Sequence, residues 1–358
     1  MTDDRRAARM PVSFPQHSLG SRIDKRLGEF LDAWGNPVSD PGVEAAYGLL
    51  ADFILGGGKR VRPQLCYWGW RGAGGDDCEE IITAAAALEL CHAGLLIHDD
   101  IMDGSDLRRG QATVHRSLSA LHKGPGAEAF GRAGGILLGT LSLAWSDALL
   151  SSCGVEADRL RAAHHLFDAM RTEVISGQYL DVLAQLRAGA TEAQALTVIR
   201  YKSAKYTVER PLQIGGALAG APPDLLDAYS RFGVPLGEAF QLRDDVLGTF
   251  GSAEETGKSA LDDLREGKQT VMYAHAVQHA SPAQLAHLRT WHGNPELTEE
   301  RAEEVRRILI DTGALARVEN MIEDRVRQAV AALDEAQIKP EAAGVLAEMA
   351  DQLAHRSK

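Results

Sequence analysis

Residues 77–104 read DCEEIITAAAALELCHAGLLIHDDIMDG and predict one long α-helix with an acidic end. Apolar residues recur at the three- and four-residue spacing of a buried helix face: Ile82, Leu88, Leu90, Leu95, Leu96 and Ile101. Asp77 is followed three residues later by Glu80, the pattern of an N-terminal capping box. Gly104 suits the left-handed conformation that often follows a helix. We therefore expect about seven turns of helix, with residues 98–103 at the carboxyl end.

Helical spacing extends over almost the whole chain, and the sequence has no alternating strand pattern. Further helices are predicted over residues 22–34, 43–55, 132–151, 157–187, 193–219, 225–250, 268–278, 282–291, 298–312, 314–334 and beyond Pro340. Pro211 and Pro235 fall inside two of these helices and should kink or split them. Glycines and prolines are spread along the chain rather than gathered in a linker. The sequence therefore predicts one all-α domain over residues 21–358, preceded by a flexible arm over residues 1–20.

Composition places the chain among globular proteins. It has 358 residues, of which 45% are hydrophobic and 25% are charged, which supports a sizeable core. Asp and Glu outnumber Lys and Arg by 50 to 38, and the net charge of -12 argues against a general nucleic-acid binder. The four cysteines follow no zinc or disulfide spacing, so we expect thiols in a reducing compartment. The best candidate membrane span, Ala133–Trp145, is too short, and we expect a cytoplasmic protein.

The acidic end of the long helix is a candidate metal site. Asp99 and Asp103 are four residues apart and share a helix face, where like charges repel unless a cation neutralises them. Carboxylates at a helix C-terminus also oppose the helix dipole. Mg²⁺ binds through one or two carboxylates together with substrate phosphates. A charged, solvated helix end is the alternative, but its electrostatic cost favours the metal site. His98 is expected to be a packed or hydrogen-bonded histidine, because Mg²⁺ prefers oxygen ligands.

Two basic segments flank this acidic end. Residues 56–63 read GGGKRVRP, where glycines allow close backbone approach and guanidinium groups match phosphate oxygens. Arg108 and Arg109 follow the acidic run directly and suit a polyphosphate. The alternatives are a helix C-cap with solvated cations for the first segment, and salt bridges to Asp103 and Asp106 for the second.

A second acidic cluster lies near residue 244. Gln241 and Asp244 are three residues apart on one helix face, and Asp245 follows. Lysines come after this cluster at positions 258 and 268, the latter within DDLREGK at residues 262–268. Two acidic helix ends, each followed by cations, suggest the facing halves of a metal–diphosphate site, although either alone is compatible with a protein surface.

In order and spacing, these four segments resemble the trans-isoprenyl diphosphate synthases of the polyprenyl synthetase family, over roughly residues 20–350. Supporting matches are Gly177-Gln178 with Asp181, and Tyr201-Lys202-Ser203-Ala204. The resemblance implies a single-domain antiparallel helix bundle around a central cavity, of the isoprenoid synthase type, and a homodimer. Bundle cores are natural places for facing carboxylates that hold metals.

The resemblance also implies the roles of individual residues. The diphosphate of the acceptor, isopentenyl diphosphate, would be held by Lys59, Arg62, His92 and Arg109. Three Mg²⁺ ions bound with the allylic diphosphate would be coordinated by Asp99, Asp103 and Asp244, with support from Asp100 and Asp245. The allylic diphosphate would be contacted by Arg108, Lys202, Ser203, Gln241, Lys258 and Lys268. The catalytic set would comprise the five aspartates with Arg108 and Lys202.

The sequence departs from the family pattern at three positions. Gly248 replaces the third Asp of a strict second DDxxD motif, so the metal role falls to Asp244 and Asp245. Ser203 replaces a frequent Thr and keeps a hydroxyl, and Thr140 stands where the family often has Asp. None of these changes removes a residue that binds metal or phosphate in the expected site.

The expected reaction is Mg²⁺-dependent condensation of isopentenyl diphosphate with dimethylallyl, geranyl or farnesyl diphosphate. Geranylgeranyl diphosphate is the expected product, because Gly94 and Leu95, one turn before Asp99, are smaller than the aromatic residues that stop the tail early in the family. The alternative for Gly94 is close helix packing. Alternative functions are a synthase of another chain length (farnesyl or longer), a terpene cyclase, and a noncatalytic partner subunit of a heteromeric synthase. The acceptor-site cations argue against the cyclase, and both Asp pairs argue against the noncatalytic subunit.

Overall fold

The computed structural model describes residues 16–34, 36–186, 189, 191–251 and 261–354, and these are almost entirely helical. The helices are α1 (Gln16–Ala33), α2 (Pro41–Leu55), α3 (Val61–Gly72), α4 (Glu79–Met102), α5 (Val114–Ala120), α6 (Ala127–Ser151), α7 (Ala157–Leu186), α8 (Glu192–Val198), the π-helix η1 (Ile199–Glu209), α9 (Arg210–Ala219), α10 (Pro223–Phe250), α12 (Asp262–Glu266), α13 (Val271–His279), α14 (Pro282–Trp291), α15 (Glu299–Asp311), α16 (Ala314–Asp334) and α17 (Pro340–Ala354). Two short antiparallel strands, β1 (Leu107–Arg108) and β2 (Gln111–Ala112), form the sheet present in these ranges. The prediction of an all-α fold is confirmed.

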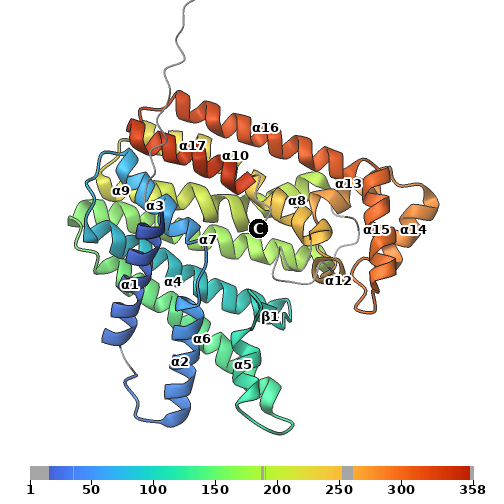
Figure 1. Cartoon of the computed structure of the whole chain (residues 1–358), viewed down its shortest axis with the longest axis horizontal. Coiled ribbons are helices and arrows are strands. Elements are labelled where there is room, and N and C mark those ends of the chain that lie inside the picture. Colours follow the sequence, from blue (N-terminus) through green and yellow to red (C-terminus); the bar gives the residue numbers. More distant parts are fainter. Residues whose placement is uncertain (1–15, 35, 187–188, 190, 252–260, 355–358) are drawn as a thin grey trace, which may run out of the picture.

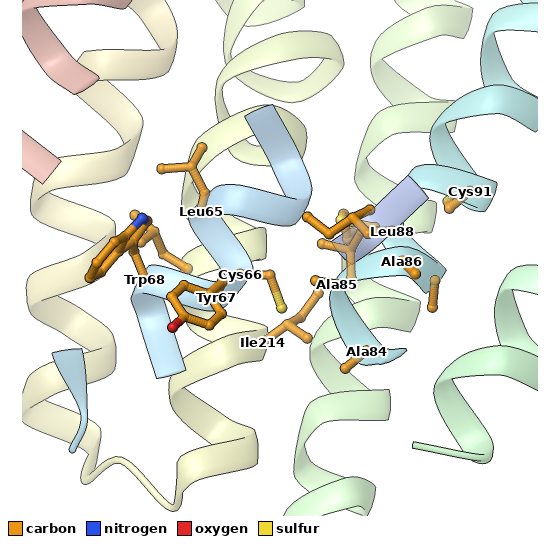
Figure 2. Packing of buried hydrophobic residues seen from close by; sticks show 14 of the residues in the cluster. Leu65, Cys66, Tyr67, Trp68, Ala84, Ala85, Ala86, Leu88, Cys91 and Ile214 are labelled. Atoms are coloured by element: carbon orange, nitrogen blue, oxygen red, sulfur yellow. The ribbon is translucent and has the colours of Figure 1, made fainter. Parts of the chain in front are cut away.

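The helices enclose two connected hydrophobic clusters. The larger cluster has α4 at its centre, with α1, α3, α6 and α9 packed around it. Figure 2 shows Cys66 of α3 and Ile214 of α9 close to the alanine-rich stretch of α4. The smaller cluster joins α13 and α15 to α10 and α16, which contribute to both clusters. In Figure 1, α10 and α16 lie side by side, and α13, α14 and α15 gather at one end of the molecule.

The predicted capping box at the start of the long helix is wrong. The helix α4 begins at Glu79 with Cys78 at its N-cap, and Cys78 makes no capping bond with its side chain. The carboxylate of Asp77 instead accepts hydrogen bonds from Arg22 of α1 at 2.8 and 3.0 Å. Asp77, which the local pattern assigned to the cap, is therefore paired with an arginine of another helix instead. The other end is as predicted, because Gly104 has φ 66°.

Other boundaries also depart from the predictions. The helix α3 was not predicted, since it is buried on nearly every side and shows no apolar stripe. The helix α1 begins at Gln16, within the segment predicted to be an arm, and residues 1–15 lie outside those described. The predicted helix over 193–219 is divided into α8, η1 and α9, with Pro211 in the first turn of α9. In contrast, α10 continues through Pro235.

A seam of glycines brings α6 close to α4. A Cβ on Gly94 of α4 would lie 2.7 Å from the carbonyl oxygen of Gly139 and 3.0 Å from Cγ of Leu143. On α6, a Cβ on Gly139 would lie 2.4 Å from Nε2 of His98, and one on Gly135 would lie 2.7 Å from Cδ1 of Ile101. The two helices therefore touch through backbone where side chains would otherwise separate them.

Two helices are long and apolar enough to cross a membrane by length and composition alone. These are α4 and α6. The expectation that no stretch reaches such a length is therefore wrong. Within the fold, most of the apolar stretch of α4 is buried, and less than half of that of α6 is buried.

Candidate active site

The acidic end of α4 concentrates negative charge in a partly buried position. Burial and then the Asp99 carboxylate raise the pKa of Asp103 to about 6, while Lys202 opposes the rise. This crowding of two carboxylates on one helix face is the arrangement that a divalent cation relieves. Asp100, which is 1% exposed, points elsewhere: its Oδ1 accepts a hydrogen bond of 2.7 Å from Nε of Arg108 and lies 2.5 Å from Nη2 of the same guanidinium. Asp100 therefore positions Arg108, which also lies 3.6 Å from Asp99.

The π-helix η1 forms the wall opposite this acidic end. Lys202 Nζ lies 2.7 Å from an Asp181 oxygen on α7 and 3.4 Å from an oxygen of Asp99. Burial lowers the pKa of Lys202, but Asp99 and Asp181 raise it more, so the ammonium stays charged. A Cβ on Gly177 of α7 would lie 2.3 Å from the backbone nitrogen of Lys202, which shows how closely α7 approaches η1. The supporting matches at Gly177 and Asp181 thus fix the position of Lys202.

The second acidic cluster lies across the pocket from Lys202. Burial raises the pKa of Asp245, which accepts hydrogen bonds from Lys268 Nζ at 3.1 Å and from Gln241 at 2.9 Å. Gln241 also accepts a bond of 2.7 Å from the hydroxyl of Ser203. Burial lowers the pKa of Lys268, but Asp245 and then Asp263 raise it well above its usual range. The charge of Lys268 in turn lowers the pKa of Asp103, so the two acidic ends lie within electrostatic reach of each other.

A pocket that is partly open to solvent lies between Lys202 of η1 and Lys268. Its lining includes the following polar residues: Asp181, Lys202, Ser203, Gln241, Asp245, Lys268, Gln269 and Thr270. Among the described residues, no three His, Cys, Asp or Glu side chains are close enough to hold a metal by themselves. Carboxylates on α4, α7 and α10 lie beside these lysines, and this set fits Mg²⁺ ions that take most of their ligands from a diphosphate and water.

A cluster of cationic and aromatic side chains lies about one turn further along η1, next to the glycine loop. The guanidinium of Arg62 lies 4.2 Å from the centre of the Tyr206 ring and donates to the Thr207 hydroxyl at 2.7 Å. The Tyr206 hydroxyl is 3.0 Å from Nδ1 of His92. Burial and then the nearby arginines lower the pKa of His92 well below its usual range, so the ring is neutral. Arg109 donates to the carbonyl of Gly57.

Buried ion pairs hold the glycine loop in place. Arg60, which is 5% exposed, has a left-handed φ of 48°. Its guanidinium donates to Glu89 at 2.6 Å, to Asp24 at 2.8 Å and to the carbonyl of Ile54 at 2.9 Å. Because Arg60 is anchored inward, the exposed Lys59 beside it lies on a fixed backbone.

The structure therefore brings most of the predicted site residues together. Arg108 pairs with Asp100 and Asp99, whereas Asp106 pairs with Arg116, so Arg108 is held at the acidic end of α4. His98 donates to the carbonyl of Ile136, as expected of a packed histidine. Lys258 lies outside the described residues. Asp244 is partly buried on the same helix as Asp245.

Three contributors were missed by the sequence analysis: Arg60, Tyr206 and Asp263. Arg60 was grouped with the ligand cations, and no local signal separates an inward arginine from an outward one. Tyr206 lies four residues beyond Lys202, a spacing that was available as a signal. Asp263 was quoted within residues 262–268 but assigned no role.

The two residues expected to set chain length, Gly94 and Leu95, have different surroundings in the structure. The missing side chain of Gly94 makes room for α6, which favours the packing alternative. Leu95 is partly buried against the larger hydrophobic cluster, four residues before Asp99.

Comparison with known proteins identifies the family of the chain. The profile of the polyprenyl synthetase family matches residues 44–309. The chain is 30% identical over 336 residues to a geranylgeranyl diphosphate synthase of Methanosarcina mazei, covering 94% of this chain and 95% of that protein. It is 33% identical over 237 residues to an octaprenyl diphosphate synthase of Escherichia coli, covering 66% of this chain and 68% of that protein.

A solved structure is similar over nearly the whole fold. The geranylgeranyl pyrophosphate synthase from Corynebacterium glutamicum, complexed with isoprenyl diphosphate and magnesium, superposes with a TM-score of 0.91 at 37% identity. The match covers 96% of this chain and 100% of that one. The chain therefore belongs to the polyprenyl synthetase family and is a prenyltransferase of the isoprenyl diphosphate synthase type.

Proposed function

We propose that the protein condenses isopentenyl diphosphate with an allylic diphosphate in the presence of Mg²⁺, and that geranylgeranyl diphosphate is its main product. The proposal is supported by two clusters of cationic side chains along η1, one beside Lys202 and one beside Tyr206. The first has lysines between facing carboxylates, and the second has arginines around a neutral histidine. Two diphosphate substrates require two such sites, whereas a cyclase requires one.

The allylic diphosphate would bind between Asp99 and Asp103 on α4 and Asp244 on α10. Three Mg²⁺ ions bound there would neutralise negative charge on the departing diphosphate. Lys202 and Lys268 stay charged in this pocket and would stabilise the same developing charge, which lets the allylic carbon–oxygen bond ionise.

The acceptor would bind with its diphosphate on Arg62 and Arg109, which directs its double bond toward the carbocation. A proton is then lost, and the released diphosphate is a suitable base, so no side chain has to take that role. The buried Leu and Ala side chains of α4 would exclude water from the reactive cation.

The product assay is the direct test. Purified protein is incubated with Mg²⁺, isopentenyl diphosphate and each of dimethylallyl, geranyl and farnesyl diphosphates, and the products are identified by mass spectrometry. Twenty-carbon product from all three primers supports the proposal. A cyclised hydrocarbon, or no turnover, contradicts the reaction, and a dominant product of fifteen or more than twenty carbons contradicts the chain length.

The chain-length proposal depends on Leu95 rather than on Gly94. Leu95→Phe enlarges the side chain one turn before Asp99 and leaves Gly94 unchanged, so it should shorten the product. Leu95→Ala is the matched variant with a smaller side chain, and its product should be at least as long as that of the wild type. Unchanged product length in two active variants would contradict a tail that passes Leu95.

We also propose a homodimer formed through α6 and α7. Both helices expose large apolar side chains at helical spacing: Phe130 and Leu137 on α6, which are 46% and 70% exposed, and Ile175, Tyr179 and Leu186 on α7, which are 56%, 69% and 81% exposed. Apolar stripes of this kind mark contact surfaces. Sedimentation of the wild type at twice the monomer mass, and of Leu137→Glu at the monomer mass, supports this dimer. A wild-type monomer contradicts it.

A further inference from the structure

Gly248 is the position where the second acidic motif lacks its third aspartate, and the structure shows what lies there instead. A Cβ built on Gly248 would be 2.0 Å from Oδ2 of Asp263 and 2.8 Å from its Cγ. Real Cβ atoms essentially never make contacts below 3.0 Å, so a side chain at position 248 would require the carboxylate of Asp263 to move from its present place. An acidic group is therefore present at this point of α10, although it comes from α12.

The carboxylate of Asp263 lies against α10, one turn after Asp244. Asp244 and Gly248 are four residues apart on α10, so their side-chain positions are neighbours about 5–6 Å apart. Oδ2 of Asp263 lies 3.8 Å from Nζ of Lys268, and the same ammonium lies 3.1 Å from Asp245. Asp263 thus belongs to the same group of charges as the two aspartates of the motif.

Hydrogen bonds from α12 to another segment fix this placement. Arg265 donates to the carbonyl of Leu297 at 2.8 and 3.2 Å. The carbonyl of Leu264 accepts a bond of 2.8 Å from the backbone of Gly293. Gly267 ends the helix with a φ of 71°. These bonds tie α12 to the segment after α14, so Asp263 is presented to α10 by a tertiary contact.

We infer that Asp263 supplies the third carboxylate of the second acidic cluster, in the place that Gly248 leaves open, and that it holds the metal–diphosphate complex together with Asp244. This inference rests on the proposed function of the site. It assigns a role to Gly248, which is to admit the carboxylate of Asp263. The competing explanation is that Asp263 only balances the charge of Lys268.

Three variants separate these explanations. Asp263→Asn removes the carboxylate, and Gly248→Ala keeps it but places a Cβ where it lies. The double variant Gly248→Asp/Asp263→Asn returns a carboxylate to the same place from α10. The control is Gly344→Ala, a helical glycine of α17 whose added Cβ would meet no atom within 4 Å.

The readout is the binding of inorganic diphosphate, measured by calorimetry with and without Mg²⁺. With Mg²⁺, affinity should fall on the order of 10- to 100-fold in Asp263→Asn and in Gly248→Ala. The double variant should recover most of the loss, and the control should match the wild type. Without Mg²⁺, Asp263→Asn should bind diphosphate no worse than the wild type, since a negative charge has been removed.

Two results would overturn the inference, provided that the variant has the same urea midpoint of unfolding as the wild type. One is unchanged Mg²⁺-dependent binding in Asp263→Asn. The other is failure of the double variant to regain affinity. Both results come from binding measurements and do not depend on turnover. The proposed function fails differently: the wild-type protein would bind Mg²⁺ and diphosphate but form no prenyl diphosphate.

Discussion

Replacing Gly94 by alanine should destabilise the protein, although alanine favours helix. The substitution gains about 1 kcal/mol of helix propensity. Its Cβ, however, would lie 2.7 Å from the carbonyl oxygen of Gly139, 3.0 Å from Cγ of Leu143 and 3.2 Å from the backbone nitrogen of Leu143. Two of these atoms are backbone, so α6 has to move away from α4, and overpacking of this kind costs about 1–3 kcal/mol. We expect a net loss of up to about 2 kcal/mol in the free energy of unfolding.

Gly344→Ala is the matched control for this prediction. It lies in α17, and its Cβ would have no neighbour within 4 Å, so only the propensity gain of about 1 kcal/mol remains. Urea unfolding of the wild type and the two variants, followed by circular dichroism, measures both changes. We predict that the free energy of unfolding falls in Gly94→Ala and rises in Gly344→Ala. If Gly94→Ala stabilises the protein as much as Gly344→Ala does, the helix seam does not constrain Gly94.

Asp99→Ala should lower turnover by about 10²–10³-fold or more. The fold should persist, because the change removes a carboxylate that repels Asp103. Near-normal turnover in a steady-state assay would refute the metal role. Tyr206→Phe should raise the KM for isopentenyl diphosphate several-fold and leave that for the allylic substrate unchanged, since Tyr206 contacts Arg62 and His92; equal effects on both substrates would contradict the two-pocket arrangement. Burial lowers the pKa of His292 to about 4, so the unfolded chain binds a proton more readily between pH 6.5 and 4. The free energy of unfolding should therefore fall over this range by about 2–3 kcal/mol more in the wild type than in His292→Phe, which retains stacking on Tyr273, and parallel pH profiles from urea titrations would exclude the effect.

The helical fold was predictable because the pattern that reports it is local. Alanine, leucine and glutamate recur at helical spacing in α4, α10 and α16, and most of the predicted helices are present. α3 was missed for the same reason, since its apolar residues from Leu65 to Trp70 are consecutive and give no period. The capping box failed because Arg22, 55 residues away, pairs with Asp77.

The site was predictable as chemistry but not as geometry. Spacing placed Asp99 and Asp103 on one face, because a single helix decides that relation. It did not show that Asp100 turns away to hold Arg108, or that Asp245 is bonded to Lys268. Those choices depend on which side chains from other helices arrive at hydrogen-bonding distance.

Sequence alone determined the secondary structure class, the acidic and basic segments and the family resemblance, since each is encoded in residues close together along the chain. Only the tertiary structure decided that Gly94 serves helix packing, that Tyr206 links Arg62 to His92, and that Asp263 fills the place beside Gly248. The physical reason is the same in all three cases. Each is a contact between separate helices, set by how closely their backbones approach, and the spacing of residues within one helix carries no information about that distance.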